Sequence, residues 1–391
     1  MCVVKKIVLR NVNSITPFRI IENSGIIIEG KKIAEIGKLE DLSFEPDEEY
    51  EFFDFEGMYA VPGFIDLHVH GGLGYGFEDE DEDALFKISE FFFQHGTTGL
   101  LATLYPKPEK EFIRELRRLA DFIEQNHSNI WGIHLEGPFL NPEERGAMNP
   151  DYLLKPSLDA WYTLRDAGRG FIKIMTIAPE LPGAYEVMRE AALDGVILSI
   201  GHSIADIDEI QTAIHNGAAH VTHMFNAMKP FHHRDPGVIT GSLLFDELKI
   251  ELIADGIHVH PMVMKLLYKI KGASGIILIT DAMKMCGLPD GEYEFADQKV
   301  IVKDKKIFLE DGTLAGSMLT MERAVKVMVE LVDVPITSAV RMASLNPARV
   351  LGKEHRKGIL ATGKDADIVV LDKDFNVHMT IYEGEIKYRR D

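Results

Sequence analysis

The stretch from Pro62 to Gly72, PGFIDLHVHGG, begins like a buried strand and ends in two histidines separated by one residue. Side chains alternate between the two faces of a strand, so His68 and His70 point to the same side, with Asp66 behind them. The stretch therefore predicts an apolar strand that presents two imidazoles at its carboxyl end. Their role depends on which other polar groups the fold brings to the same place.

Seven more apolar, strand-like runs follow, and helical patterns lie between them. Such an alternation of strands and helices is typical of a parallel sheet. Eight strands in this arrangement predict an α/β fold, a (β/α)8 barrel of the TIM type. The runs are VPGFIDLHVH from residue 61, TGLLATLYP from 98, IWGIHLEGP from 130, FIKIMTIAPE from 171, VILSIGHS from 196, AAHVTHMFNA from 218, LKIELIADGIH from 248 and GIILITDAM from 275.

Both ends of the chain have a different pattern of predicted secondary structure from the central part. They read as short strands separated by turns, with no helical pattern between them. Two strand-rich ends around one long middle indicate that the ends pair into a single small domain. We therefore expect residues 1–60 plus 355–391 to form a small β-sandwich domain and residues 61–354 to form the barrel.

Composition narrows the class of protein. The net charge of −20, from 42 basic and 62 acidic residues, argues against binding to nucleic acid or to an anionic membrane surface. No apolar run has the length of a membrane-spanning helix, and the N-terminus has no apolar segment typical of a signal peptide. Cys2 and Cys286 cannot form a disulfide framework. We therefore expect a cytoplasmic protein.

Polar side chains stand where the strand-like runs end. In a parallel barrel the carboxyl ends of all strands surround one cavity, where such enzymes place their active sites. A single histidine there is more often a hydrogen-bonded structural residue, and a single aspartate before a helix is usually an N-cap. Here a subset of four histidines and two carboxylates on five strands together favours a metal site instead. The polar residues at these ends are His68, His70, His134, Glu136, His202, His223, Asp255, His258 and Asp281.

The chemistry of this set favours a catalytic metal over a structural one. Imidazole and carboxylate ligands without cysteine suit catalytic Zn²⁺ or Fe²⁺. The ligands are too many for one tetrahedral ion with an open position, but they could hold two ions that share a carboxylate. Such a centre activates water and polarises a carbonyl group, which is machinery for hydrolysis. One ion or two remains open at this point.

Motifs for other chemistries are missing from the sequence. The glycine-rich GGLGYG at residues 71–76 lacks the spacing of a dinucleotide-binding fingerprint, and GKDAD from residue 363 is not a P-loop. No Gly-x-Ser-x-Gly elbow indicates a serine hydrolase. Redox and group-transfer chemistry therefore have no support in the sequence.

Several motifs resemble a known superfamily across nearly the whole chain. PGFIDLHVHGG is similar to the first-strand signature of the amidohydrolase superfamily, and SLNPARVLG and KGILATGKDADIVVLD resemble its C-terminal segment. Within it, the combination of HLEGPFLNPEERGAMNP, IGHS, THMFNAM, HHRDPG, ADGIHV, TDAM and TLAGSMLTM resembles the N-acetylglucosamine-6-phosphate deacetylase family. This resemblance implies a (β/α)8 hydrolase that acts on a phosphorylated amino sugar, commonly as a homodimer.

The resemblance also assigns roles to residues. It implies that metal-bound hydroxide attacks the acetyl carbonyl, with Asp281 as general base and then as general acid. One or two divalent ions per subunit, Zn²⁺ or Fe²⁺, are expected. The implied metal ligands are His68, His70, Glu136, His202, His223 and Asp281. The implied substrate contacts are Asn226, Ala227, Arg234 and His258.

One position departs from the family pattern. Some members carry a histidine shortly after HLEGP that helps to polarise the substrate carbonyl, and Met148 stands there in this sequence. Methionine cannot donate that hydrogen bond. Our hypothesis is that a second metal at His68 and His70 takes over this task.

Two alternatives compete with the deacetylase interpretation. The first is another amidohydrolase that acts on a cyclic amide or an N-acyl amino acid; many cyclic-amide members use a carboxylated lysine on strand four, whereas Lys173 lies near the start of that strand. The second is an inactive binding or scaffold protein on the same barrel, which would be expected to lack some ligands. None of the ligands is missing from the sequence.

Overall fold

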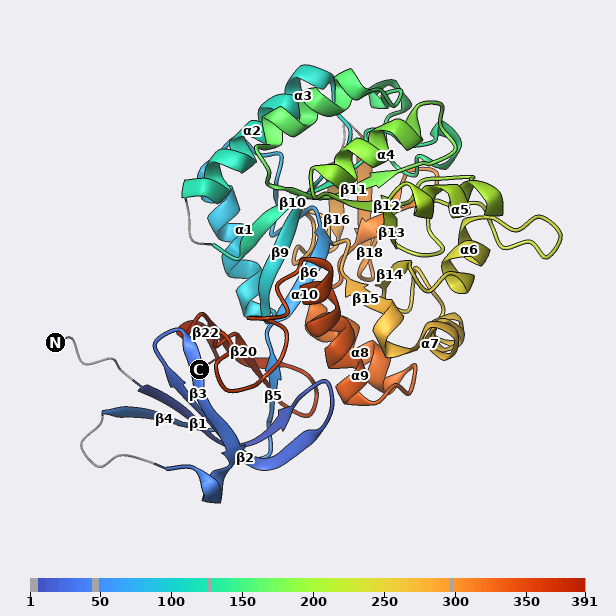
Figure 1. The fold of residues 1–391 in the computed structure, drawn as a ribbon. Helices are drawn as coiled ribbons and strands as arrows, with labels where there is room; N and C mark the ends of the chain where they lie inside the picture. The colour runs from blue at the N-terminus through green and yellow to red at the C-terminus, as the bar shows by residue number, and fades with distance from the viewer. Residues whose placement is uncertain (1–5, 44–48, 126–127, 296–297, 391) are drawn as a thin grey trace. The chain divides into compact units, whose positions relative to one another are not determined.

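The chain folds into two compact units (Figure 1). The computed structural model describes residues 6–43, 49–125, 128–295 and 298–390, so Cys2 lies outside the described residues. One unit takes the chain up to Asp66, Glu90–Gly99 and Thr320 onward, and the other takes Leu67–Ser89 and Leu100–Leu319. Each unit is considered separately below.

Eight parallel strands nearly close into a barrel, as the sequence predicts. Their neighbours in the sheet follow chain order, so each strand pairs with the one before and the one after it. Asp281 N–H donates to His68 O at 2.8 Å and His70 N–H donates to Ala282 O at 2.8 Å, which links the last strand to the first. The strands are β6 (Phe64–Val69), β9 (Thr97–Leu104), β10 (Ile130–Glu136), β11 (Ile172–Ile177), β12 (Ile197–Ile200), β13 (Ala218–Val221), β14 (Lys249–Ile253) and β15 (Ile276–Ile279).

These strands form because apolar, largely β-branched residues predominate in them, which suits a sheet buried on both faces. Helices flank the barrel (Figure 1), and α2 buries Phe112, Leu116 and Leu119 along one side. Among the described helices, none is long and apolar enough to cross a membrane. The α-helices described in the two units together are α1 (Glu82–Gln94), α2 (Glu109–Gln125), α3 (Leu158–Gly168), α4 (Ala184–Leu193), α5 (Ile207–His215), α6 (Val238–Leu244), α7 (Pro261–Gly275), α8 (Met321–Glu330), α9 (Ile336–Ala343) and α10 (Leu345–Val350).

The two ends of the chain pair into a separate strand-rich sheet, which confirms their predicted association. β5 and β20 join the N-terminal and C-terminal segments in antiparallel register, with Ala60 opposite Val370. Leu9, Ile26 and Met379 lie in the buried core of this sheet. Its strands are β1 (Lys6–Ile15), β2 (Ile20–Glu29), β3 (Lys32–Lys38), β4 (Tyr50–Asp54), β5 (Tyr59–Pro62), β20 (Ile368–Leu371), β21 (Val377–Tyr382) and β22 (Glu385–Arg389).

A second small sheet lies between β15 and α8 in the chain, where the sequence analysis predicts no strands. Its antiparallel strands are β16 (Gly291–Phe295), β17 (Gln298–Lys303), β18 (Lys306–Leu309) and β19 (Leu314–Ser317). In β17, Val300 and Val302 are buried while Ile301 is exposed, so the alternation of a strand is present in the sequence. Phe295 of this sheet packs with Tyr105 and Met283 of the barrel unit. The sheet thereby supplies one wall of the cavity described next.

Candidate active site

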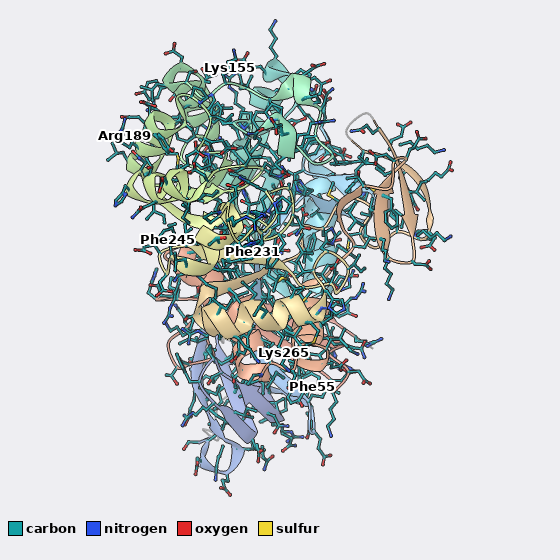
Figure 2. The ribbon with its side chains drawn as sticks, turned by 90° about the vertical axis from the view of Figure 1, so that its right-hand side faces the viewer. Phe55, Lys155, Arg189, Phe231, Phe245 and Lys265 are labelled. Atoms are coloured by element: carbon teal, nitrogen blue, oxygen red, sulfur yellow. The ribbon has the colours of Figure 1, made fainter. Side chains whose placement is uncertain are left out.

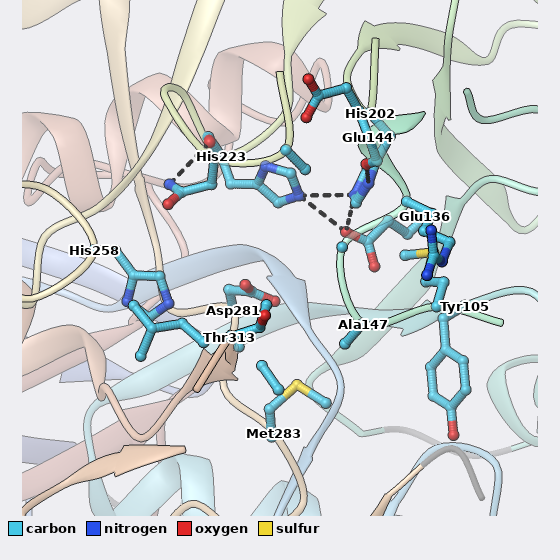
Figure 3. Close-up of a pocket in the computed structure, with 18 of the residues that line it drawn as sticks. Tyr105, Glu136, Glu144, Ala147, His202, His223, His258, Asp281, Met283 and Thr313 are labelled. Carbon is cyan, nitrogen blue, oxygen red and sulfur yellow. Dashed lines mark hydrogen bonds and ion pairs between the residues drawn. The ribbon is translucent and has the colours of Figure 1, made fainter. Parts of the chain in front are cut away.

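The six predicted metal ligands converge at the carboxyl ends of the barrel strands, and Figure 3 labels four of them, Glu136, His202, His223 and Asp281. His68 lies in β6 and Glu136 ends β10. The other four follow directly after β6, β12, β13 and β15, namely His70, His202, His223 and Asp281. Residues more than two hundred positions apart in the sequence thus meet in one place, as the parallel barrel requires.

Glu136 stands between two pairs of histidines. Its Oε1 atom lies 3.1 Å from His202 Nε2 and 3.0 Å from His223 Nε2. The same atom lies 3.5 Å from His68 Nε2, and Oε2 lies 3.4 Å from His70 Nε2. One carboxylate therefore reaches both histidine pairs, which is the arrangement expected of a ligand that two ions share.

Asp281 faces the pair from the first strand. Its Oδ1 atom lies 3.2 Å from His70 Nε2 and 3.5 Å from His68 Nε2. Asp281 is 8% exposed, so it borders the cavity without being open to bulk water. Its position allows contact both with an ion at the first-strand histidines and with a substrate in the cavity.

Hydrogen bonds orient two of the histidines with Nε2 toward the centre. His202 Nδ1 donates to the carbonyl oxygen of Glu144 at 2.7 Å, and His68 Nδ1 donates to Glu251 Oε2 at 3.0 Å. Because a carbonyl oxygen can only accept, His202 carries its proton on Nδ1 and turns an Nε2 electron pair inward. His223 Nε2 lies only 3.1 Å from His202 Nε2. Two ring nitrogens this close to each other and to a carboxylate fit a shared cation, so the residues present suit a divalent metal.

The electrostatics of the site also favour a cation. Burial opposes charge on Glu136, but the neighbouring histidines, His68 foremost, hold the pKa of Glu136 well below its usual value. Burial likewise opposes the imidazolium of His70, yet Asp281 and Glu136 raise the pKa of His70 to about 9. The carboxylates thus stay ionised and attract positive charge. Two triads meet the geometry of a metal site, His68–His70–Glu136 and Glu136–His202–His223, with all ligand atoms of each within 4.8 Å of one another.

A third triad of His68, His134 and Glu251 has the same spacing but a different role. His134 Nδ1 donates to Leu67 O at 2.9 Å, and His134 Nε2 accepts from Thr176 Oγ1 at 2.8 Å. Burial, reinforced by His68, lowers the pKa of His134 to about 3. Both ring nitrogens are therefore engaged within the protein, and His134 is a neutral structural residue.

The backbone at the ligand positions is held in an unusual conformation. His202, His223 and Asp281 have φ angles of 49°, 25° and 51°. Left-handed conformations are uncommon for residues other than glycine and cluster at functional sites, where the surrounding structure holds them in place. The turns that follow β12, β13 and β15 thus aim each side chain inward at some conformational cost.

The ligand centre opens into a cavity of about 720 Å³. Asn226, Ala227 and His258, three of the predicted substrate contacts, line this cavity. His258 Nδ1 lies 2.6 Å from Asp255 Oδ2. Burial disfavours the His258 imidazolium, but Asp255, with a smaller contribution from Asp281, raises the pKa of His258 above its usual value. Asp255 thus favours the charged form of His258 at this side of the cavity.

Arg234, the fourth predicted substrate contact, is not brought to this cavity. It is exposed, and its Nη1 donates to His233 Nε2 at 2.9 Å. It belongs to the loop after β13 that also carries the exposed Phe231, which Figure 2 labels. Among the described lining residues, Arg145 is the one arginine or lysine. Its position in the turn after β10 was not anticipated from the sequence.

The sequence analysis missed two further residues of the site, and only the first has a signal in the sequence. Glu251 interrupts the apolar run KIELI, and a carboxylate inside a strand buried on both faces needs a buried partner. Glu144 acts through its backbone oxygen on His202, a contact that no residue type can indicate.

Comparisons with known proteins point to one family. Residues 59–387 match the amidohydrolase family. The chain is 36% identical over 391 residues, 98% of each chain, to N-acetylglucosamine-6-phosphate deacetylase from Bacillus subtilis (strain 168). It is 39% identical over 333 residues to the deacetylase of that name from Lysinibacillus sphaericus, covering 85% of this chain and 86% of the relative. A mutant of the Mycobacterium smegmatis deacetylase, solved in complex with N-acetyl-D-glucosamine-6-phosphate, matches with a TM-score of 0.91 and 31% identity, covering 98% of this chain and 99% of that chain.

Proposed function

This chain belongs to the amidohydrolase family, and we propose that it hydrolyses the N-acetyl group of N-acetylglucosamine 6-phosphate to release acetate and glucosamine 6-phosphate. The observation that carries this proposal is the position of Glu136 between two histidine pairs, with Asp281 facing the same centre. The relatives that match nearly the full length of the chain are deacetylases of this substrate, and their names supply the substrate class.

The residues that would hold one or two divalent ions are His68, His70, Glu136, His202, His223 and Asp281. When bound, such ions acidify a water molecule and polarise the carbonyl oxygen of the amide. The identity of the ion, Zn²⁺ or Fe²⁺, stays a prediction from the ligand types.

Asp281 moves the proton in the proposed reaction. Burial opposes its charge, but His68 and His70 hold the pKa of Asp281 below its usual value, so it is ready to accept a proton at neutral pH. It takes a proton from the attacking water as the new carbon–oxygen bond forms. It then gives that proton to the amide nitrogen as the carbon–nitrogen bond breaks, because an unprotonated amine leaves poorly.

The cavity offers polar residues that could bind the sugar phosphate. Asn226, Ala227 and His258 line the cavity, and Arg145, which also lines it, can meet a phosphate group with paired N–H donors. Arg234 lies outside the cavity of its own chain. In the homodimer expected from the resemblance, we propose that Arg234 reaches the phosphate site of the second subunit.

The experiment that tests this function compares acetate release from N-acetylglucosamine 6-phosphate and from N-acetylglucosamine, with metal analysis of each preparation. We expect the phosphorylated sugar to be preferred and Asp281→Asn to lose about 10²- to 10⁴-fold in kcat. Equal turnover of both sugars would remove the phosphate assignment. Full activity of Asp281→Asn would remove the proposed role of Asp281.

A further inference from the structure

The cavity has two sides of opposite character. Figure 3 shows His258 and Tyr105 on opposite sides of Asp281 and Glu136. The side of His258 is polar, since His258 Nδ1 lies 2.6 Å from Asp255 Oδ2. The side of Tyr105 is apolar. The reacting centre lies between the two, so a bound amide must direct one substituent to each side.

The apolar side consists of four side chains that we call the acyl wall: Tyr105, Met148, Met283 and Phe295. All four line the cavity and belong to one packed cluster. Tyr105, Met283 and Phe295 are buried, at 6%, 3% and 7% exposure. The Tyr105 ring lies 4.9 Å from the Phe295 ring and 6.0 Å from the His70 ring, between centroids. The wall therefore begins next to a predicted metal ligand.

Tyr105 presents its ring to this side of the cavity, and its hydroxyl is directed away from Glu136 (Figure 3). The wall thus offers an apolar surface beside His70, one of the predicted metal ligands. Two of its members are methionines, whose unbranched side chains adapt to different shapes. An acetyl group would contact such a surface with only one methyl group.

We propose that the acyl wall sets the acyl specificity of this chain and admits linear N-acyl groups of two to four carbons on the amino sugar phosphate. This inference rests on the proposed function. The reaction remains hydrolysis of the same amide bond: water supplies the oxygen of the carboxylate, the carbon–nitrogen bond breaks, and a proton passes to the amine. Only the length of the released acid changes.

A second cavity explains what limits the acyl length. It has a volume of about 320 Å³, and Tyr105 and Phe295 line both cavities. The two rings therefore stand between the cavities. Lys107 lines the second cavity and its Nζ lies 5.5 Å from the centroid of the Tyr105 ring. Removal of the Tyr105 ring would join the two spaces and lengthen the room for an acyl chain.

The test measures kcat/KM for the N-acetyl, N-propionyl, N-butyryl and N-hexanoyl derivatives of glucosamine 6-phosphate. We expect the first three to agree within about tenfold and the hexanoyl derivative to fall by at least about a hundredfold. In Tyr105→Ala, the hexanoyl-to-acetyl ratio of kcat/KM should rise at least about tenfold. Tyr105→Leu, which keeps an apolar side chain, tests the same ratio if the alanine variant does not fold.

Tyr293→Ala is the matched control. Tyr293 packs against the same cluster but does not line the cavity, and its hydroxyl donates to Pro289 O at 2.9 Å. It should lower thermal stability and leave the acyl ratio unchanged within about threefold. A more than hundredfold drop from acetyl to propionyl in the wild type would overturn the inference, as would an unchanged ratio in the Tyr105 variants or an equal shift in the control. Failure to release acid from every substrate would instead overturn the proposed function.

Discussion

Glu251 Oε2 lies 3.0 Å from His68 Nδ1, and both side chains are completely buried. The same oxygen accepts the backbone N–H of His223 at 3.1 Å, so one carboxylate contacts a ligand residue from each histidine pair. Burial opposes its charge, but His68 foremost lowers the pKa of Glu251 to about 2. The carboxylate therefore fixes the His68 proton on Nδ1 and leaves Nε2 for a metal.

Replacement of Glu251 should weaken metal binding at His68 and His70. We expect Glu251→Ala to lose about 10- to 100-fold in affinity for that ion, because the imidazole loses its orienting partner. Glu251→Gln keeps an acceptor oxygen and should recover part of the loss. Metal analysis and calorimetric titration of metal-depleted protein measure both effects.

The control for this prediction is a partly buried glutamate–histidine pair in the other unit. Glu322 Oε1 lies 2.8 Å from His95 Nδ1, and Glu322→Gln makes the same chemical change there. It should leave metal content unchanged. Wild-type affinity in both Glu251 variants would contradict the positioning role of Glu251.

The first-strand histidine pair should determine whether the site binds a second metal ion. His70→Ala removes a ligand from the first-strand pair but leaves the contacts of Glu136 with His202 and His223. After chelation and titration with Zn²⁺ or Fe²⁺, we expect two equivalents per wild-type chain and one per His70→Ala chain, with measurable activity in the variant. One equivalent in the wild type would show that the His-x-His sequence does not add a second ion.

Much of the fold could be predicted because the signals are local. Each barrel strand is a mostly apolar run, and the parallel arrangement alone brings the strand ends together. The converging positions of Glu136 and Asp281 follow from that argument without further information. The catalytic and ligand roles assigned to them remain predictions.

Other features depend on contacts that are distant in the sequence. β16–β19 carry strand alternation, but their packing against Tyr105 and Met283 comes from the folded structure. The choice of Nδ1 or Nε2 at His202 depends on the carbonyl of Glu144, which any residue would supply. Arg234 belongs to the HHRDPG motif, which predicts a phosphate contact. The loop that contains it nevertheless places Arg234 outside the cavity of its own chain.

A substitution at Met148 can test which group polarises the carbonyl of the substrate. It lines the cavity and packs against the cluster of Tyr105 and Phe295, an apolar role that needs no hydrogen bond. If the ion at His68 and His70 polarises the carbonyl, Met148→His should change kcat by less than about tenfold, since no task is left for the new imidazole. A hundredfold gain in kcat, with metal content unchanged, would contradict the hypothesis.

The pair of Asp255 and His258 should make stability depend on pH. Burial opposes both charges, but the mutual contact at 2.6 Å raises the pKa of His258 and lowers the pKa of Asp255. The His258 contribution is complete below the ordinary imidazole value near 6.5 and is lost as pH rises through the raised pKa. The Asp255 contribution is complete above the ordinary carboxyl value near 3.8 and is lost as pH falls through the lowered pKa.

Asp255→Asn should therefore destabilise the protein most at pH values between these limits. We expect a loss of about 1–3 kcal/mol in the free energy of unfolding at pH 5.5 and a smaller loss at pH 9, measured by chemical denaturation. Asp166→Asn is the control, because exposed Asp166 pairs with Arg165, whose charge does not change in this range. If Asp255→Asn costs the same at both pH values, the contact does not depend on the imidazolium, and the charge assigned to His258 in the cavity is wrong.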